Sequence, residues 1–271
     1  MANNIDFEVI ISTCDKYSDL WDAHVFLMNQ NWTTRGKTWL VTDAPTQRSL
    51  DGVELICAGV GTEITQRLKV ALERVEAEYI LFTLDDYFLT KPIAAEALQR
   101  SLEVMREENL DYMRLFPNPV YRLRREGAVE IPGHPGYYLR DTSEGNYKVS
   151  LYPGLWRTDF MRKTLDKPLN AWQYEVALTP MAHQMNARCA ISNNHEFPFL
   201  DVIRKGKVLR KADRYFQRNP IYQSNRPVRT VWEEVKLDTR TWIGRVLPKP
   251  LFNAVKRLMI KLGMEFYSPI K

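Results

Sequence analysis

The feature that most constrains the fold is residues 79–89, YILFTLDDYFL, where apolar and β-branched residues end in two adjacent carboxylates. A run of this kind is typical of a strand that is buried on both faces in an α/β sheet. Asp85 and Asp86 would then lie at the carboxyl end of the strand, where open parallel sheets bind ligands. Paired carboxylates at such a position commonly hold Mg²⁺ beside phosphates. Acids also cap turns, so this stretch alone leaves both interpretations open.

Strands and helices are expected to alternate over about the first 110 residues. Apolar stretches that predict strands lie at residues 7–13, 37–45, 53–59 and 111–119. Helical patterns lie after residue 18, over about residues 62–76 and from Lys91-Pro92 onward. In the second of these, Ile64, Leu68 and Leu72 recur at the spacing of one helix face. The alternation predicts an α/β fold with a mostly parallel sheet flanked by helices.

Two common nucleotide-binding signatures are missing from the sequence. The first predicted strand is not followed by GxGxxG, and the chain contains no GxxxxGK[ST]. Neither the usual dinucleotide fingerprint nor a P-loop is therefore expected. A bound nucleotide would be held by polar side chains at the strand ends. The candidates are Ser12, Thr13 and Asp15 after the first strand and Asp43 after the second.

The pattern changes after the first half of the chain. Residues 122–150 are richer in Gly, Pro and charged residues, and they predict an excursion or hairpin that covers a site. A later helix is expected to begin near Ala171. Trp172 and Glu175 would share one surface of that helix, because residues three apart are neighbours.

Charge is distributed unevenly along the chain, whose net charge is +5. Residues 1–200 carry 21 Lys and Arg against 27 Asp and Glu, a net −6, whereas residues 201–271 carry 17 against 6, a net +11. Near the end, LPKPLFNAVKRLMIKLG predicts an amphipathic helix with a basic face. We expect this helix to lie on an anionic membrane surface. A helix docked on the core is the alternative, and the acidic strand ends argue against nucleic acid as a partner.

Three widely spaced cysteines form neither a metal-ligand pattern nor a disulfide framework, which fits a reducing cytoplasm. The N-terminal residues do not resemble a signal peptide. No apolar run approaches the roughly 18 residues that a membrane-spanning helix needs. We therefore expect a cytoplasmic protein that is peripheral at the inner membrane face.

Several segments resemble, in their order and spacing, a group of bacterial GT-A-type glycosyltransferases that build capsular, exo- or lipopolysaccharides. They are VIISTCDKYSDLW, KTWLVTDAP, GTEITQRLKVALERVEAEYILFTLDDYFL, VSLYPGLWRTDFMRKTL, AWQYE and RKGKV. The resemblance implies a GT-A-like catalytic domain over residues 1–210, with a donor half up to about 115 and an acceptor half from about 116. Residues 211–271 would form a basic helical C-terminal extension.

The resemblance also implies a nucleotide-sugar donor across the carboxyl ends of the first strands. Ser12, Thr13 and Asp15 would contact the nucleoside. Asp43 would hold the base or ribose, and Arg67 would face the donor.

Asp85 and Asp86 then occupy the place of the family's DxD motif. The sequence departs from this motif, because Tyr87 stands where the second acid belongs. Either Asp86 alone reaches a divalent cation, Mn²⁺ or Mg²⁺, or the metal is weakly held or dispensable. His195 would be a late metal ligand or an ordinary structural histidine.

Glycosyl transfer to a hydroxyl needs a general base and a group that stabilises the departing diphosphate. Glu175 is the predicted base, and the alternative is a glutamate that only complements the helix dipole. Lys205 and Lys207 of the RKGK turn would supply cations to the diphosphate if no metal is bound. Trp156 and Trp172 would stack on an acceptor sugar, or else belong to the core.

The sequence therefore predicts a transferase that moves a sugar from a nucleotide-sugar donor to a hydroxyl of a glycan acceptor. The acceptor is expected to be lipid-linked, and the reaction is expected to invert the anomeric carbon. One alternative is a nucleotidyltransferase of sugar activation. The other is a non-catalytic carbohydrate- or polyanion-binding protein.

Overall fold

The computed structural model describes residues 6–235, and these residues form two compact units. The first unit comprises residues 6–202 and 219–223, and the second comprises residues 203–218 and 224–235. The division after residue 202 falls before the domain boundary that was expected at residue 210. The basic amphipathic helix expected near the end of the chain lies outside the described residues.

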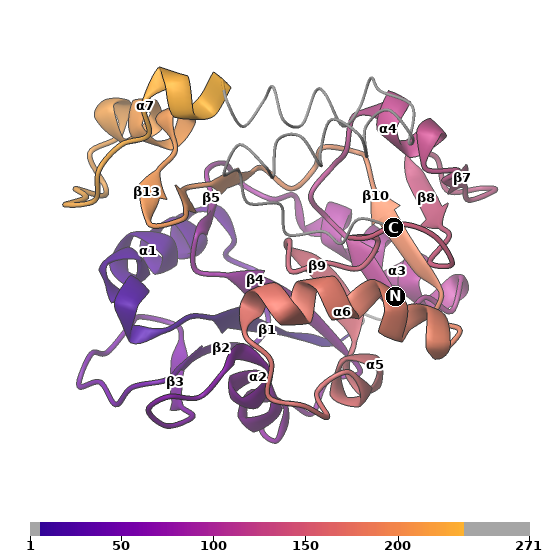
Figure 1. Cartoon of the computed structure of the whole chain (residues 1–271), viewed down its shortest axis with the longest axis horizontal. Coiled ribbons are helices and arrows are strands. Elements are labelled where there is room, and N and C mark those ends of the chain that lie inside the picture. Colours follow the sequence, from indigo (N-terminus) through magenta and orange to yellow (C-terminus); the bar gives the residue numbers. More distant parts are fainter. Residues whose placement is uncertain (1–5, 236–271) are drawn as a thin grey trace, which may run out of the picture. The chain divides into compact units, whose positions relative to one another are not determined.

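A nine-stranded sheet runs through the described part of the first unit (Figure 1). Its strand order is β3-β2-β1-β4-β9-β6-β10-β8-β7. The strands β3, β2, β1 and β4 are parallel to one another, and β6 is parallel to β10. β9 lies between β4 and β6 and runs antiparallel to both. β8 runs antiparallel to β10. The strands are β1 (Phe7–Ser12), β2 (Thr38–Thr42), β3 (Glu54–Cys57), β4 (Tyr79–Leu84), β6 (Tyr112–Arg114), β7 (Val129–Glu130), β8 (Tyr137–Arg140), β9 (Gly154–Arg157) and β10 (Cys189–Ser192). The α/β fold with a mostly parallel sheet is confirmed.

Helices cover both faces of this sheet and bury a separate apolar cluster on each face. Side chains of α1 (Trp21–Asn31) and α3 (Ala95–Glu107) pack in one cluster with Val9 and Ile11 of β1. Side chains of α2 (Ile64–Leu72), α5 (Thr158–Lys163) and α6 (Ala171–Gln184) pack in the other with Ile10. The central strands are mostly apolar because alternate residues enter opposite clusters. None of the described helices is long and apolar enough to cross a membrane.

Asp85 and Asp86 lie at the carboxyl end of the strand, as the sequence predicted. β4 ends at Leu84, and Asp85 and Asp86 form a turn into the short strand β5 (Tyr87–Leu89). β5 leaves the main sheet and pairs antiparallel with β11 (Phe199–Asp201). The turn places the two acids beyond the carboxyl end of β4.

Residues 122–150 form the excursion that was expected. It contains the end of α4 (Val120–Arg125) and the hairpin of β7 and β8 at the edge of the sheet. A buried ion pair anchors this region, since Arg140 donates to Glu126 at 2.8 Å. Two further short elements of the first unit are the 3-10 helix η1 (Asp15–Leu20) and the strand β11 already described.

The second unit begins with the hairpin of β12 (Ile203–Arg204) and β13 (Lys207–Val208). Its turn is formed by Lys205 and Gly206, both with left-handed backbone angles, φ 54° and 73°. A helix, α7 (Arg210–Arg218), follows. Lys207 pairs with Glu233 at 2.5 Å within the same unit. The turn expected around residues 205–207 is therefore present.

Candidate functional site

The candidate site lies at one edge of the main sheet. β1, β2 and β4 are parallel, so their carboxyl ends meet there, and Ser12 of β1 is in register with Val41 of β2 and Leu84 of β4. Thr13, Asp43 and Asp85 follow directly after these strands. The register thus places one polar side chain from each strand end close to the next, as the sequence predicted.

Thr13 is the centre of a buried hydrogen-bond network at this edge. Its hydroxyl donates to the Asp85 carboxylate and accepts a 2.7 Å bond from Trp21 Nε1 of α1. His24, one turn further along α1, bonds through Nδ1 to the main-chain oxygen of Asp85 at 3.0 Å. Because a carbonyl oxygen only accepts, Nδ1 must carry the proton. The network fixes Asp85, which is only 7 % exposed.

Burial lowers the pKa of His24 to about 4, against a small opposing effect of its bond to Asp85. The imidazole is therefore neutral near pH 7 and adds no charge to the site. Trp21 and His24 were not expected from the sequence. Trp21 ends the segment VIISTCDKYSDLW but was given no role there, and His24 lies outside the segments that carry the resemblance.

Asp43 and Cys14 lie in the loops that follow the neighbouring strands β2 and β1. Asp43 accepts a 2.8 Å bond from the main-chain N–H of Asp15, which ties the loop after β1 to the end of β2. Burial raises the pKa of the Cys14 thiol, the carboxylates of Asp85 and Asp43 raise it further, and Arg67 lowers it. All three groups therefore influence the Cys14 thiol electrostatically.

Arg67 extends from α2 toward this edge. An η nitrogen donates to the carbonyl of Thr62, and the Nε atom is buried with no hydrogen-bond partner among the described residues. The hydroxyl of Ser12 is also buried without such a partner in the described chain. Both atoms are therefore available to hydrogen-bond a ligand at this edge.

Asp86 differs from Asp85 in its exposure. Its side chain is half-buried, and its main-chain oxygen accepts a 2.8 Å bond from the N–H of Val202, which anchors the turn. Asp86 is thus more exposed than Asp85 as a whole residue, although its Oδ1 atom is buried. Mg²⁺ is typically bound by one or two carboxylates together with substrate phosphates, and this pair fits that donor set.

Tyr87 does not join the acids. It is 8 % exposed and packs between aromatic rings, with centroid distances of 5.4 Å to Tyr152 and 5.8 Å to Phe116. No group of three or more His, Cys, Asp or Glu that could hold a metal occurs among residues 6–235. His195, expected as a late metal ligand, is exposed in the loop after β10 with a left-handed φ of 58°.

Glu175 reaches the same edge from another direction. α6 begins at Ala171, as predicted, because the Asn170 side chain caps it in a capping box with Gln173. The Glu175 carboxylate accepts a 3.4 Å bond from the N–H of Leu151. Leu151 lies just before β9, whose first residue pairs with Phe82 near the end of β4. Glu175 is therefore held beside the edge that carries Asp85 and Asp86.

The two tryptophans expected to bind the acceptor lie in different environments. Trp172 is 40 % exposed in the first turn of α6. Trp156 of β9 is fully buried against Tyr112 and Phe160, with ring centroids 4.6 Å and 5.8 Å away. A buried core ring has no face for a sugar, so we do not retain an acceptor role for Trp156. Lys205 and Lys207 belong to the second unit, and their predicted role toward the donor stays a prediction.

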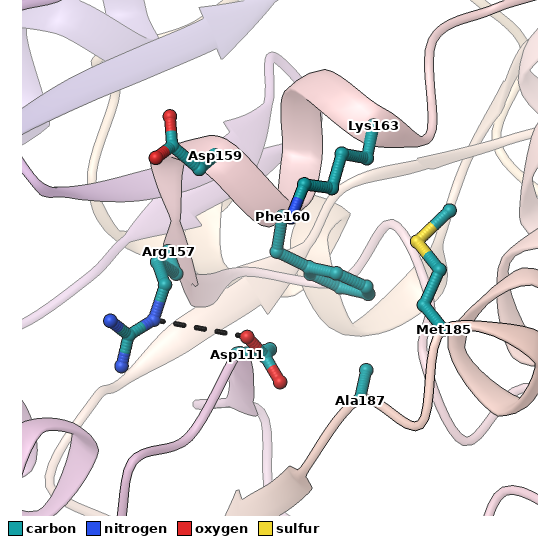
Figure 2. A pocket seen from close by; sticks show the side chains of 7 residues that line it. All are labelled: Asp111, Arg157, Asp159, Phe160, Lys163, Met185 and Ala187. Atoms are coloured by element: carbon teal, nitrogen blue, oxygen red, sulfur yellow. Dashed lines mark ion pairs between the residues drawn. The ribbon is translucent and has the colours of Figure 1, made fainter.

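A small pocket lies at the opposite edge of the sheet, near the end of β9 and the start of β6 (Figure 2). Its volume is about 180 Å³, and its lining includes Asp111, Arg157 and Lys163. Arg157 Nε lies 3.8 Å from Asp111 Oδ1, so these charges already compensate each other. Because it opens away from the carboxyl ends of the parallel strands, it is not part of the candidate site.

No protein-family model and no curated protein matches the chain. Solved structures of low similarity include S. aureus TarS 1-349 in complex with UDP-GlcNAc, at 18 % identity and a TM-score of 0.49 over 75 % of this chain and 60 % of that one. A mannosyltransferase from Pyrobaculum calidifontis in complex with GDP-Man and Mn²⁺ is 12 % identical, with a TM-score of 0.49 over 76 % and 59 % of the two chains. CMP:2-keto-3-deoxy-manno-octonic acid synthetase complexed with CTP is 15 % identical, with a TM-score of 0.42 over 69 % and 88 %.

These similarities neither establish a family nor assign an activity to the chain. The chain spans 37 % of a longer TarS structure, and 60 % and 59 % of the TarS 1-349 and mannosyltransferase chains.

Proposed function

We propose that the chain is a glycosyltransferase that moves a sugar from a nucleotide-sugar donor to a hydroxyl of a glycan acceptor. The observation that carries the proposal is the meeting of two groups at one sheet edge. The donor group consists of Asp43, Arg67, Asp85 and Asp86, and the base is Glu175 on α6. A binding module would not require a carboxylate held separately from the donor acids.

The proposed donor site follows from the strand ends. Ser12, Thr13, Asp15 and Asp43 line the ends of β1 and β2, where a nucleoside is expected. The buried Nε of Arg67, without a partner in the described chain, is available to an acceptor atom of the donor.

Asp86 is proposed to bind the donor diphosphate through a divalent cation, Mn²⁺ or Mg²⁺. Such a cation would offset the negative charge that develops on the diphosphate. Asp85 stabilises the turn that carries Asp86, because the Thr13 hydroxyl donates a hydrogen bond to the Asp85 carboxylate.

Glu175 is proposed to act as the general base. It accepts the proton of the acceptor hydroxyl as that oxygen attacks the anomeric carbon. The bond between that carbon and the diphosphate oxygen breaks, and the electron pair leaves with the nucleoside diphosphate. Attack from the face opposite the leaving group inverts the anomeric centre. Trp172, exposed on the first turn of the same helix, is placed to contact the acceptor.

Thermal unfolding with a panel of UDP, GDP, CMP and dTDP, each with and without Mn²⁺, tests the proposal. We expect one nucleotide to raise Tm saturably, and Asp43→Ala to abolish that shift. Glu73→Ala, an exposed acid on the C-terminal side of α2, is the matched control and should leave the shift unchanged. If no nucleotide shifts Tm under either condition, the proposed function is wrong.

A further inference from the structure

Arg114, the last residue of β6, is a buried cation without a carboxylate partner. It is 4 % exposed and forms no ion pair with any described residue. Its Nε donates to the main-chain oxygen of Phe116 at 2.7 Å, and no described residue accepts from its terminal nitrogens. Nearby Arg140 differs, because it is paired with Glu126 at 2.8 Å.

An unpaired buried charge is costly, which is why buried charges are normally paired. Burial lowers the pKa of Arg114, Tyr152 and Tyr112 partly oppose this effect, and the charge of Arg140 adds to it. Arginine nevertheless stays protonated in proteins. A costly unpaired cation fits a position whose partner is a ligand rather than a side chain.

The guanidinium is held in one orientation by an aromatic ring. Its central carbon lies 3.8 Å from the ring centroid of Tyr152 and 5.7 Å from that of Phe116. Stacking fixes the plane of the guanidinium and leaves its edge for hydrogen bonds. The planar edge matches the two oxygens of a phosphate or carboxylate.

Arg114 also lies at the edge of the sheet that carries the candidate site. It pairs with Gly154 at the start of β9, and the next residue, Leu115, bonds to Pro153 at 2.9 Å. The same segment supplies Leu151, whose N–H bonds to Glu175. The Tyr152 ring that stacks on Arg114 contacts Tyr87, the residue after Asp86. Tyr152 therefore links the guanidinium to Tyr87, and the adjacent residue Leu151 links the same segment to Glu175.

We propose that Arg114 binds an anionic group, a phosphate or a carboxylate, of the glycan acceptor. The inference rests on the proposed function, in which the donor diphosphate lies at Asp86 and the acceptor lies beside Glu175. On this proposal the acceptor glycan carries an acidic group, and Arg114 determines the specificity for that group.

Inorganic phosphate is the first probe, measured by thermal unfolding against chloride at equal ionic strength. Wild type should be stabilised saturably, and Arg114→Gln should weaken the apparent phosphate affinity at least tenfold. Arg114→Lys keeps the charge but not the planar edge, so its phosphate affinity should lie between those of wild type and Arg114→Gln. The control Arg124→Gln, an exposed arginine of α4, should stay within twofold of wild type. Equal phosphate binding by wild type and Arg114→Gln, or none by wild type, overturns the proposal.

Two readouts separate this role from others. A structural arginine would lower Tm when replaced, whereas Arg114→Gln without phosphate should leave Tm unchanged or raise it, since an unpaired buried charge is removed. With the stabilising nucleoside diphosphate at saturation, the phosphate effect should persist. A tenfold loss of nucleotide affinity in Arg114→Gln would instead assign the residue to the donor and refute the acceptor role. If no nucleotide binds, the proposed function fails, while the phosphate titrations still decide whether Arg114 is an anion site.

Discussion

Replacing Thr13 by valine removes one hydroxyl from the network at the ends of β1 and β4. In the native protein this hydroxyl donates to the Asp85 carboxylate and accepts from Trp21 Nε1. Thr13, Trp21 and Asp85 are 4 %, 1 % and 7 % exposed, so water has little access to replace the lost bonds. Valine has nearly the same shape as threonine, so the change removes hydrogen bonding with little change in packing.

The expected cost follows from these two bonds. A hydrogen bond to a charged group contributes about 1.5–3 kcal/mol, and an unsatisfied buried donor costs about 1–3 kcal/mol. Taking a value near the lower end of this sum, we expect the free energy of unfolding to fall by about 3 kcal/mol. For a domain of this size, that loss lowers Tm by roughly 6–12 °C.

Equilibrium urea unfolding, followed by tryptophan fluorescence, measures this loss. Thr13→Ser keeps the hydroxyl, deletes one methyl group and should cost about 1 kcal/mol or less. The Thr13→Val change should cost less in an Asp85→Asn background, because the charged acceptor is then absent. A Thr13→Val protein within about 0.5 kcal/mol of wild type, or one no less stable than Thr13→Ser, would refute the reasoning.

Three further predictions concern stability. The native His24 pKa of about 4 lies below the unfolded value near 6.5. The free energy of unfolding should therefore fall by roughly 3 kcal/mol as pH drops from 6.5 to 4. In urea titrations, His24→Asn should remove this dependence on pH. Gly36→Ala would place a Cβ 2.1 Å from the Phe7 main-chain oxygen, and it should lower Tm by an amount equivalent to about 1–3 kcal/mol; an unchanged Tm would contradict the packing there. Leu68→Ala deletes a fully buried side chain of α2 and should lower the free energy of unfolding, measured in urea, by at least about 2 kcal/mol. A smaller loss would show that the surrounding side chains collapse into the space.

The sheet could largely be predicted from sequence, because its central strands leave a local signal. FEVIIS and YILFTL are mostly apolar, as is typical of strands covered on both faces. The start of α6 was also readable, since Asn170 and Gln173 form a capping box. These signals depend only on residues close together in the chain.

Other features depend on contacts between distant residues and left no local signal. After Asp86, β5 leaves the main sheet and pairs with β11, which lies more than a hundred residues later. The insertion of β9 between β4 and β6 likewise follows from tertiary pairing. The sequence also suggested a sugar-stacking role for Trp156, which is instead a core residue, because composition does not distinguish buried from exposed tryptophan.

The candidate site was predictable at the strand ends and much less so elsewhere. Asp43 and Asp85 could be placed because parallel strands share one edge. Trp21 bonds to the hydroxyl of Thr13, and His24 bonds to the main-chain oxygen of Asp85. Arg114 lies over the ring of Tyr152. Partners of that kind have no fixed spacing in a sequence.

The measurement that tests the central claim most directly is turnover of the nucleotide sugar whose nucleotide binds in the thermal panel. Release of nucleoside diphosphate is followed for wild type, Glu175→Gln and the exposed control Glu73→Gln. Glu175→Gln keeps an oxygen for the Leu151 N–H but cannot accept the proton, so its kcat should fall a hundredfold or more at unchanged nucleotide affinity, on the scale of general-base catalysis. Glu73→Gln should retain wild-type turnover. Unimpaired turnover by Glu175→Gln would contradict the assignment of the base and the mechanism built on it.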